Sequence, residues 1–194
     1  AGTYAETVVI DTEMLSLIGA DSRVTMIDPP GAKTTSGLVA IKVNSCTNVL
    51  IKNIGIIDAY DGIRLSDADS CTITSDSFSG LGNFAVYARS MFSNITNNMI
   101  FNLNNGGYCV QLDSGQNTIS ANTIDSGSYG ILVTTESNVI TLNTIKNNLN
   151  IGVYLNAAAS YGNRIETNTV TGNGSWGVYL AGPENRAYGN IIRQ

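Results

Sequence analysis

The eight residues from Asn117 to Ile124 read NTISANTI, and close variants of this stretch return along the chain. Clear copies are NVITLNTI at residues 138–145, NRIETNTV at residues 163–170 and NRAYGNII at residues 185–192. Looser copies keep only the register, through Ile73, Asp76 and Phe78 and then through Ile95, Asn98 and Ile100. The copies begin at residues 49, 71, 93, 117, 138, 163 and 185, so the period is close to 22 residues. A fixed period of this length indicates a repeat architecture.

A second motif lies between these copies and consists of a small residue followed by apolar-x-apolar. It occurs as Gly62-Ile63-Arg64-Leu65, Ala85-Val86-Tyr87-Ala88, Cys109-Val110-Gln111-Leu112, Gly130-Ile131-Leu132-Val133, Gly152-Val153-Tyr154-Leu155 and Gly177-Val178-Tyr179-Leu180. Apolar residues that alternate over so few positions, bounded by Gly, Asn and Ser, are typical of short strands. Helix-forming stretches and the leucine-rich frame are missing. We therefore predict an all-β fold, a single-stranded right-handed parallel β-helix of about eight coils.

Stacked coils place equivalent residues above one another. Two interior columns are expected, one of Ile73, Ile95, Ile119, Ile140 and Ile165, the other of Ile63, Val86, Val110, Ile131, Val153 and Val178. A polar row of Asp76, Asn98, Asn122, Asn143, Asn168 and Asn190 is expected where each coil turns a sharp corner. Asn tolerates the left-handed backbone conformation, and stacked amides hydrogen-bond from coil to coil. We therefore interpret this row as structural rather than as a ligand site.

The repeats resemble those of the NosD-like, carbohydrate-binding and sugar-hydrolysis group of parallel β-helices. The opening Gly2-Thr3-Tyr4-Ala5-Glu6-Thr7-Val8-Val9-Ile10 is similar to the start of the first full coil in pectin-esterase-like and NosD-like proteins. The resemblance implies the fold and a link to polysaccharides, because this fold group includes lyases, polygalacturonases, tailspikes and non-catalytic surface modules. Copper delivery, which the NosD name suggests, is not expected, because the chain has no His and its four Met residues are dispersed.

The composition of the chain argues against several classes of partner. The chain has 194 residues, of which 13% are charged and 43% hydrophobic, and a net charge of −5. An acidic surface argues against nucleic acid as a partner, and the apolar runs are too short to insert into a membrane. We expect residues 1–194 to form one β-helix domain, excised from a longer secreted or surface protein. Cys46, Cys71 and Cys109 show no metal-binding spacing, so no metal is expected.

The x residue of the second motif points outward and supplies the candidate binding residues. The residues chosen for carbohydrate binding combine aromatic, amide and cationic side chains: Lys42, Arg64, Tyr87, Gln111, Tyr154, Asn156 and Tyr179. Tyr stacks on sugar rings, whereas Arg and Asn bind their hydroxyls. A column of small residues, represented by Gly62, Gly130 and Gly152, is expected beside them, so that a shallow trough runs along the axis. An ordinary solvated sheet face explains the same pattern equally well.

Arg64, Arg89 and Asp113 on three successive coils are the candidate catalytic residues. A lyase acting on an acidic glycan needs cations, or Ca²⁺, to neutralise the sugar carboxylate and a group to abstract the adjacent proton. Acidic residues that could hold Ca²⁺ cluster around the Arg64 coil: Asp58, Asp61, Asp67, Asp69 and Asp76. Solvated loop carboxylates explain this cluster more simply. Asp113 lacks the carboxylate neighbour that a glycosidase requires.

Three functions remain open at this point. The favoured one is a polysaccharide-recognising β-helix domain of an extracellular or cell-surface protein. The alternatives are the catalytic β-helix of a polysaccharide lyase or depolymerase, and a purely structural surface rod. Besides a polysaccharide, the expected partners are a second copy at the coil ends or neighbouring domains of the same chain, since uncapped coils expose sheet edges.

Overall fold

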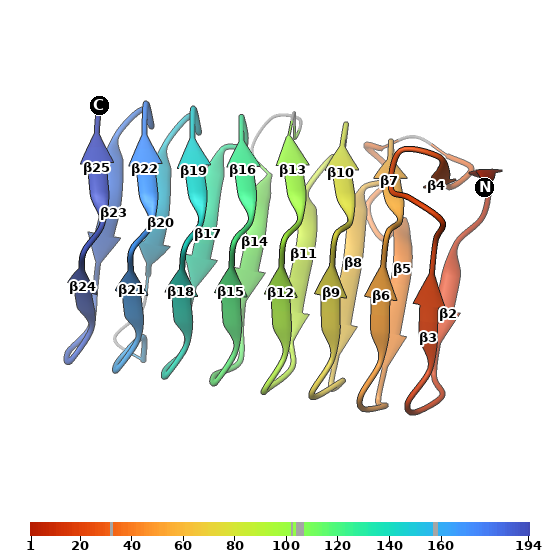
Figure 1. Cartoon of the computed structure of the whole chain (residues 1–194), viewed down its shortest axis with the longest axis horizontal. Helices are drawn as coiled ribbons and strands as arrows, with labels where there is room; N and C mark the ends of the chain where they lie inside the picture. Colours follow the sequence, from red (N-terminus) through yellow and green to blue (C-terminus); the bar gives the residue numbers. More distant parts are fainter. Residues whose placement is uncertain (32, 102, 104–106, 157–158) are drawn as a thin grey trace.

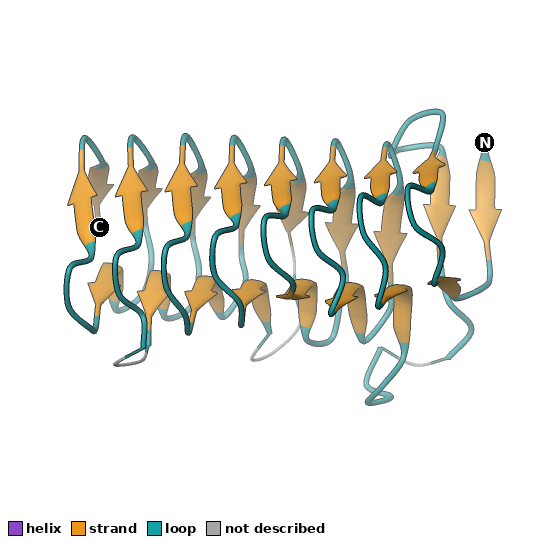
Figure 2. Ribbon diagram, turned by 90° about the horizontal axis from the view of Figure 1, so that it is seen from below, coloured by secondary structure: helices purple, strands orange, loops and turns teal. Residues whose placement is uncertain are grey.

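The computed structural model describes residues 1–194 except 32, 102, 104–106 and 157–158. In the described part the chain winds as a right-handed solenoid, and each coil contributes a strand to three parallel sheets (Figure 1). This confirms the predicted fold class. The loops of successive coils lie in line when the solenoid is seen from below (Figure 2). No helix in the described ranges is long and apolar enough to cross a membrane.

The three sheets, which we call A, B and C, take their strands in chain order. Sheet A contains β1 (Gly2–Tyr4), β4 (Thr25–Ile27), β7 (Gly55–Ile57), β10 (Ser77–Ser79), β13 (Met99–Phe101), β16 (Thr123–Asp125), β19 (Thr144–Lys146), β22 (Thr169–Thr171) and β25 (Ile191–Arg193). Sheet B contains β2 (Val8–Ile10), β5 (Val39–Asn44), β8 (Asp61–Ser66), β11 (Phe84–Arg89), β14 (Tyr108–Leu112), β17 (Tyr129–Val133), β20 (Ile151–Leu155) and β23 (Trp176–Leu180). Sheet C contains β3 (Ser16–Ile18), β6 (Leu50–Lys52), β9 (Thr72–Thr74), β12 (Asn94–Thr96), β15 (Thr118–Ser120), β18 (Val139–Thr141), β21 (Arg164–Glu166) and β24 (Arg186–Tyr188).

The core is the inside of the solenoid, and its columns are those that the repeats predict. In sheet C, Ile95 pairs with Ile73 on one side and with Ile119 on the other, and the column continues to Ile165. In sheet B, the column from Ile63 to Val178 is likewise in register. Nearly all of these residues are fully buried, and the hydrophobic effect of their burial is the main force that holds the coils together.

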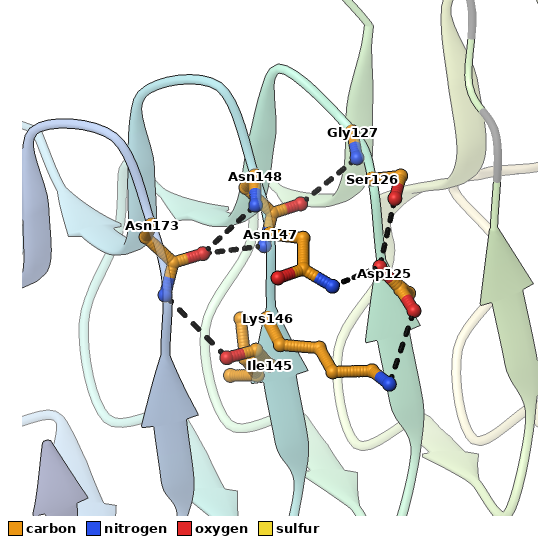
Figure 3. A network of polar contacts seen from close by, with 8 residues as sticks. All are labelled: Asp125, Ser126, Gly127, Ile145, Lys146, Asn147, Asn148 and Asn173. Atoms are coloured by element: carbon orange, nitrogen blue, oxygen red, sulfur yellow. Dashed lines mark hydrogen bonds and ion pairs between the residues drawn. The ribbon is translucent and has the colours of Figure 1, made fainter. Parts of the chain in front are cut away.

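Buried Asn side chains form a ladder at each of the three corners. Between sheets C and A, the backbone N–H of each ladder residue donates to the amide oxygen one coil further on, as in Asn98 to Asn122 at 2.9 Å. Asn117, Asn138 and Asn163 repeat this arrangement between sheets B and C. Between sheets A and B, Gly127 donates to Asn148, whose backbone N–H donates to Asn173 (Figure 3). The ladders satisfy backbone groups that the corners would otherwise leave buried and unpaired.

The expected backbone conformation of the ladder Asn residues is wrong. The left-handed residue is the one that precedes each of them, for example Asn97, Ala121, Leu142 and Thr167, with φ between 55° and 58°. The chain makes its sharp turn at this preceding residue, which leaves the Asn side chain free to point inward. Asn is therefore required at the corner for its amide group and not for its tolerance of positive φ.

Candidate functional site

The outward column of sheet B lies where the second motif predicts it. Strand pairing places Arg64 between Lys42 and Tyr87, and Gln111 beside Tyr87. The column continues through Leu132 to Tyr154 and Tyr179. These residues therefore form one continuous row up the outer face of sheet B, although Leu132 is almost completely buried.

The small residues do not form a trough beside this row. Ala40, Ala85 and Cys109 are fully buried, and so are Gly62, Gly130 and Gly152. A Cβ built on Gly62 would lie 2.9 Å from Phe78 and 3.1 Å from Leu81, which are both core residues. Two successive residues of each strand thus face the interior, which a straight strand does not allow. The strands bend at the small residue, and the expectation of an outward small column is wrong.

Because of this bend, the residue before the small one points outward. Phe84, Tyr108 and Tyr129 occupy this position on successive strands, and their rings stack at centroid distances of 5.8 and 5.0 Å with interplanar angles of 20° and 19°. Tyr129 stacks in turn on Tyr154 at 5.9 Å. Tyr154 meets Tyr179 edge to face at 5.3 Å, and Trp176 lies 5.4 Å from Tyr179. We call the six residues Phe84, Tyr108, Tyr129, Tyr154, Trp176 and Tyr179 the aromatic ladder.

The geometry of the aromatic ladder decides which rings can stack on a ligand. Tyr108 and Tyr129 each lie nearly parallel to a neighbour on both sides, so their two faces are shared with other rings. At the C-terminal end the stacking changes to tilted and edge-on contacts. Trp176 is 54% exposed there and Tyr179 is 40% exposed. These two rings offer the accessible aromatic surface of the ladder.

Sequence reasoning selected Tyr154 and Tyr179 but missed Phe84, Tyr108 and Tyr129. The signal was present, because an aromatic residue precedes the small residue in Phe84-Ala85, Tyr108-Cys109, Tyr129-Gly130 and Trp176-Gly177. It was obscured by the assumption that residues alternate strictly between the two faces of a strand.

At the other end of the aromatic ladder, Arg64 is held in a fixed position. Its Nε lies 2.6 Å from the Oδ2 of Asp61, which is completely buried. Asp61 Oδ1 also accepts hydrogen bonds from Asn83 Nδ2 and from the backbone N–H of Phe84. The guanidinium lies over the rings of Tyr87 and Phe84, at 5.0 and 5.6 Å from their centroids. Ion pairing, hydrogen bonds and cation–π contacts together orient this side chain.

Asp113 is the centre of a second polar group on the same face. Its carboxylate accepts hydrogen bonds of 2.8 Å from Tyr87 Oη, Gln111 Nε2 and Thr134 Oγ1. Burial, reinforced by the hydrogen bond to Asp113, raises the pKa of Tyr87. The phenol therefore stays protonated and acts as the hydrogen-bond donor of this pair.

The candidate catalytic residues Arg64, Arg89 and Asp113 follow one another on adjacent coils, but no hydrogen bond or ion pair joins them in the described part of the chain. Arg89 Nη2 instead pairs with Asp67 Oδ2 at 3.0 Å on the exposed surface. Tyr154 Oη donates to Asn156, so these two candidate binding residues do meet. Lys42 makes no ion pair within the described ranges.

The acidic residues around the Arg64 coil are dispersed. Asp58 pairs with Lys33, Asp61 with Arg64 and Asp67 with Arg89, while Asp69 accepts the backbone N–H of Met91. Asp76 lies inside the corner between sheets C and A. Among the described residues, no group of three or more His, Cys, Asp or Glu side chains is placed to hold a metal ion.

A single chain wound into three stacked parallel sheets, with polar and aromatic rows on its outer face, defines a parallel β-helix protein. A family model described as "Periplasmic copper-binding protein (NosD)" matches residues 21–194. The chain therefore belongs to the NosD family, which confirms the resemblance found in its repeats. No curated protein sequence matches this chain.

Solved structures share the fold at low sequence identity. DFA-IIIase from Arthrobacter chlorophenolicus A6 in complex with GF2 has a TM-score of 0.75 and 14% identity, over 97% of this chain and 66% of that one. The tailspike protein of E. coli bacteriophage HK620, in mutant form, has a TM-score of 0.62 and 12% identity, over 86% of this chain and 41% of that one. An exopolygalacturonase from Thermotoga maritima has a TM-score of 0.59 and 10% identity, over 98% and 72% of the two chains. The chain spans 62% of DFA-IIIase in its DFA-III complex, so only part of that enzyme has a counterpart here.

The donor atoms of this chain do not suit the copper that the family description names. Copper sites use imidazole, thiolate and thioether ligands, and the chain has no His. Cys46, Cys71 and Cys109 are buried, and burial raises the pKa of all three thiols, which opposes formation of the thiolate. The described residues therefore do not fit the copper of the family description.

Proposed function

We propose that this domain recognises a polysaccharide along the outer face of sheet B, and that it does so outside the cytoplasm, in an extracellular or cell-surface protein. The observation that carries the proposal is the pair of accessible rings, Trp176 and Tyr179, at the end of the aromatic ladder. Sugar rings pack their apolar faces against such side chains. The exopolygalacturonase and the DFA-IIIase bound to GF2, which share the fold, support a carbohydrate ligand.

The rest of the row supplies polar contacts for an extended glycan. The column of Lys42, Arg64, Tyr87, Gln111, Tyr154 and Tyr179 follows the solenoid axis, with about 4.8 Å between neighbouring strands. Asn156 lies beside Tyr154. A glycan chain parallel to the axis would stack on Trp176 and Tyr179 and use these groups for its hydroxyls.

The test is retention of the protein in native gels that contain single polysaccharides. A Trp176→Ala and Tyr179→Ala double variant should bind its glycan about tenfold more weakly, because each lost aromatic contact contributes about 0.5–1.5 kcal/mol. Tyr161→Ala is the matched control, since this ring is also exposed but lies in the turn after β20. If the double variant binds as strongly as the wild type, the sheet B assignment is wrong.

A second candidate is a polysaccharide lyase that uses Arg64, Arg89 and Asp113. The contact of Tyr87 with both Arg64 and Asp113 favours it, because a cation, a phenol and a carboxylate meet on one face. The same incubations test it when they are read by ultraviolet absorbance, since elimination leaves an unsaturated sugar end. Absorbance that is lost in Asp113→Asn would support catalysis, whereas glycan binding without new absorbance would leave a binding domain. A structural rod would show neither.

A further inference from the structure

Two arginines face outward side by side on sheet C. They lie on β21 and β24, the strands that follow β20 and β23 of sheet B in the chain. Arg164 of β21 and Arg186 of β24 are paired positions on adjacent strands. Together with Gly162 and Glu184 they line a cavity of about 320 Å³. Neither residue belongs to the proposed sheet B site.

The cavity carries two guanidinium groups and one carboxylate, that of Glu184. Arg164 Nη2 lies 3.2 Å from Glu166 Oε1. Arg186 forms no ion pair with any described residue, although the chain carries 15 acidic side chains and only 10 basic ones. Like charges on directly adjacent strand positions destabilise a sheet. An anion bound between the two guanidinium groups would remove this repulsion.

An aromatic ring lies next to the two arginines. Tyr188 follows Arg186 by two residues on β24, so both side chains point to the same side of sheet C. Its hydroxyl donates to Glu166, the residue that also pairs with Arg164. This bond fixes the ring, which is 50% exposed. Two guanidinium groups and the Glu184 carboxylate thus line the cavity, and Tyr188 lies on the same side of sheet C as Arg186.

We propose that Arg164, Arg186 and Tyr188 form a subsite for an acidic sugar residue, in which the two guanidinium groups bind an oxyanion, either a carboxylate or a sulfate, and Tyr188 packs against the sugar ring. Guanidinium groups match the geometry of both oxyanions and keep their charge at all physiological pH values. This subsite rests on the proposed function, because its ligand is also a polysaccharide. It lies on sheet C, however, whereas the proposed binding face lies on sheet B.

The experiment measures retention in native gels that contain polygalacturonate or dextran sulfate, with methyl-esterified pectin and plain dextran as neutral counterparts. Arg186→Gln should weaken retention by the acidic polymer about tenfold, the effect of losing a hydrogen bond to a charged group. Arg193→Gln is the matched control, because it removes the same charge from an exposed position on sheet A. Tyr188→Phe keeps the ring but loses its anchor, and it should weaken retention less than Tyr188→Ala.

The outcomes separate the two proposals. Weaker retention of Arg186→Gln than of Arg193→Gln supports the subsite, and the polymer that shows the difference identifies the carboxylate or the sulfate as its ligand. Equal losses in both variants would mean that only net charge matters, and the subsite would be refuted. It would also be refuted if the wild type ignored both acidic polymers. Retention by a neutral polymer that depends on Trp176 and Tyr179 would still support the sheet B site in either case.

Discussion

Asp76 is the one acidic member of the polar row between sheets C and A, and its position explains an unusual ionisation. Its Oδ1 accepts the backbone N–H of Ile54, as the Asn residues accept from the coil before them. Where Asn98 and Asn122 donate their amide to a carbonyl, Asp76 has no amide hydrogen, and its Oδ2 lacks a partner in the described structure. Burial raises the pKa of Asp76 to about 7. Below about pH 7 the side chain is therefore a neutral acid in the position of an Asn.

This pKa makes stability depend on pH in a definite direction. The folded state binds a proton that the unfolded chain, with an Asp pKa of about 3.9, has already lost. The free energy of unfolding should therefore fall as pH rises from about 4 to about 7 and stay constant above that. Asp76→Asn should remove this slope and stabilise the protein on the alkaline side, since each unit of pKa shift corresponds to about 1.4 kcal/mol. Urea unfolding of both proteins across this range is the measurement.

Asn98→Asp is the reciprocal variant for the same titration. It places a second buried acid in the row and should steepen the fall of stability with pH. A wild type and an Asp76→Asn variant with identical pH profiles would contradict this account of Asp76.

At the scale of the elements, the corners combine a strained residue with a stabilising one. Each ladder residue gains two or three buried hydrogen bonds, whereas the residue before it adopts the left-handed conformation. That conformation costs an L-residue with a Cβ roughly 1–2 kcal/mol. Among the left-handed residues described at the corner between sheets C and A, Gly189 is a glycine, whereas Ser75, Ala121, Leu142 and Thr167 carry a Cβ. The corner is held by its amide ladder in spite of the strain beside it.

Leu142 is the clearest case for relieving this strain. It has a φ of 58° and is 64% exposed, so its side chain contributes little packing. Leu142→Asn should raise the free energy of unfolding by about 1 kcal/mol, because Asn adopts the left-handed conformation more readily. Leu142→Ala, which removes the side chain but keeps the strain, should give no gain. Equal midpoints for all three proteins in denaturant would show that the corner is not strained.

For the molecule as a whole, stability is a sum over neighbouring coils, because each coil contacts mainly the coils on either side of it. Ile119 lies in the middle of the solenoid and is fully buried, whereas Ile192 in the last coil described is 51% exposed. Ile119 belongs to sheet C and Ile192 to sheet A, and the same residue type therefore experiences very different packing in the middle of the solenoid and in the last coil described.

Truncation at these two positions should differ accordingly. Ile119→Ala should lower the free energy of unfolding by about 2–5 kcal/mol, the usual range for a buried aliphatic side chain. Ile192→Ala should cost less than about 1 kcal/mol, because half of the side chain already contacts solvent. Hydrogen exchange should show the strongest protection around β12, β15 and β18. A loss at Ile192 as large as that at Ile119 would contradict the additive description.

The repeat made the fold predictable, and it also explains where prediction failed. Ile73, Ile95 and Ile119 recur at a fixed spacing, so their stacking follows from the period alone. Gly62 faces the core and Phe84 faces outward because the backbone bends within the strand. A strict alternation of inward and outward residues does not predict this bend. Partners such as Asp61 for Arg64 and Asp67 for Arg89 are set by side-chain geometry at neighbouring corners, and spacing along the sequence does not determine them.

The ladders also determine how the length of this protein can change. Every rung joins equivalent positions of adjacent coils, as between Asn117 and Asn138. Removing residues 117–137 would join Gln116 to Asn138, and both flanking turns have the same left-handed geometry, with φ of 62° at Gln116 and 59° at Ser137. Each sheet would lose one strand, and Ile95 would meet Ile140 in the register that Ile119 now occupies. Insertions and deletions of one whole coil therefore preserve all three corners, whereas a change of a few residues within a strand would disrupt them together.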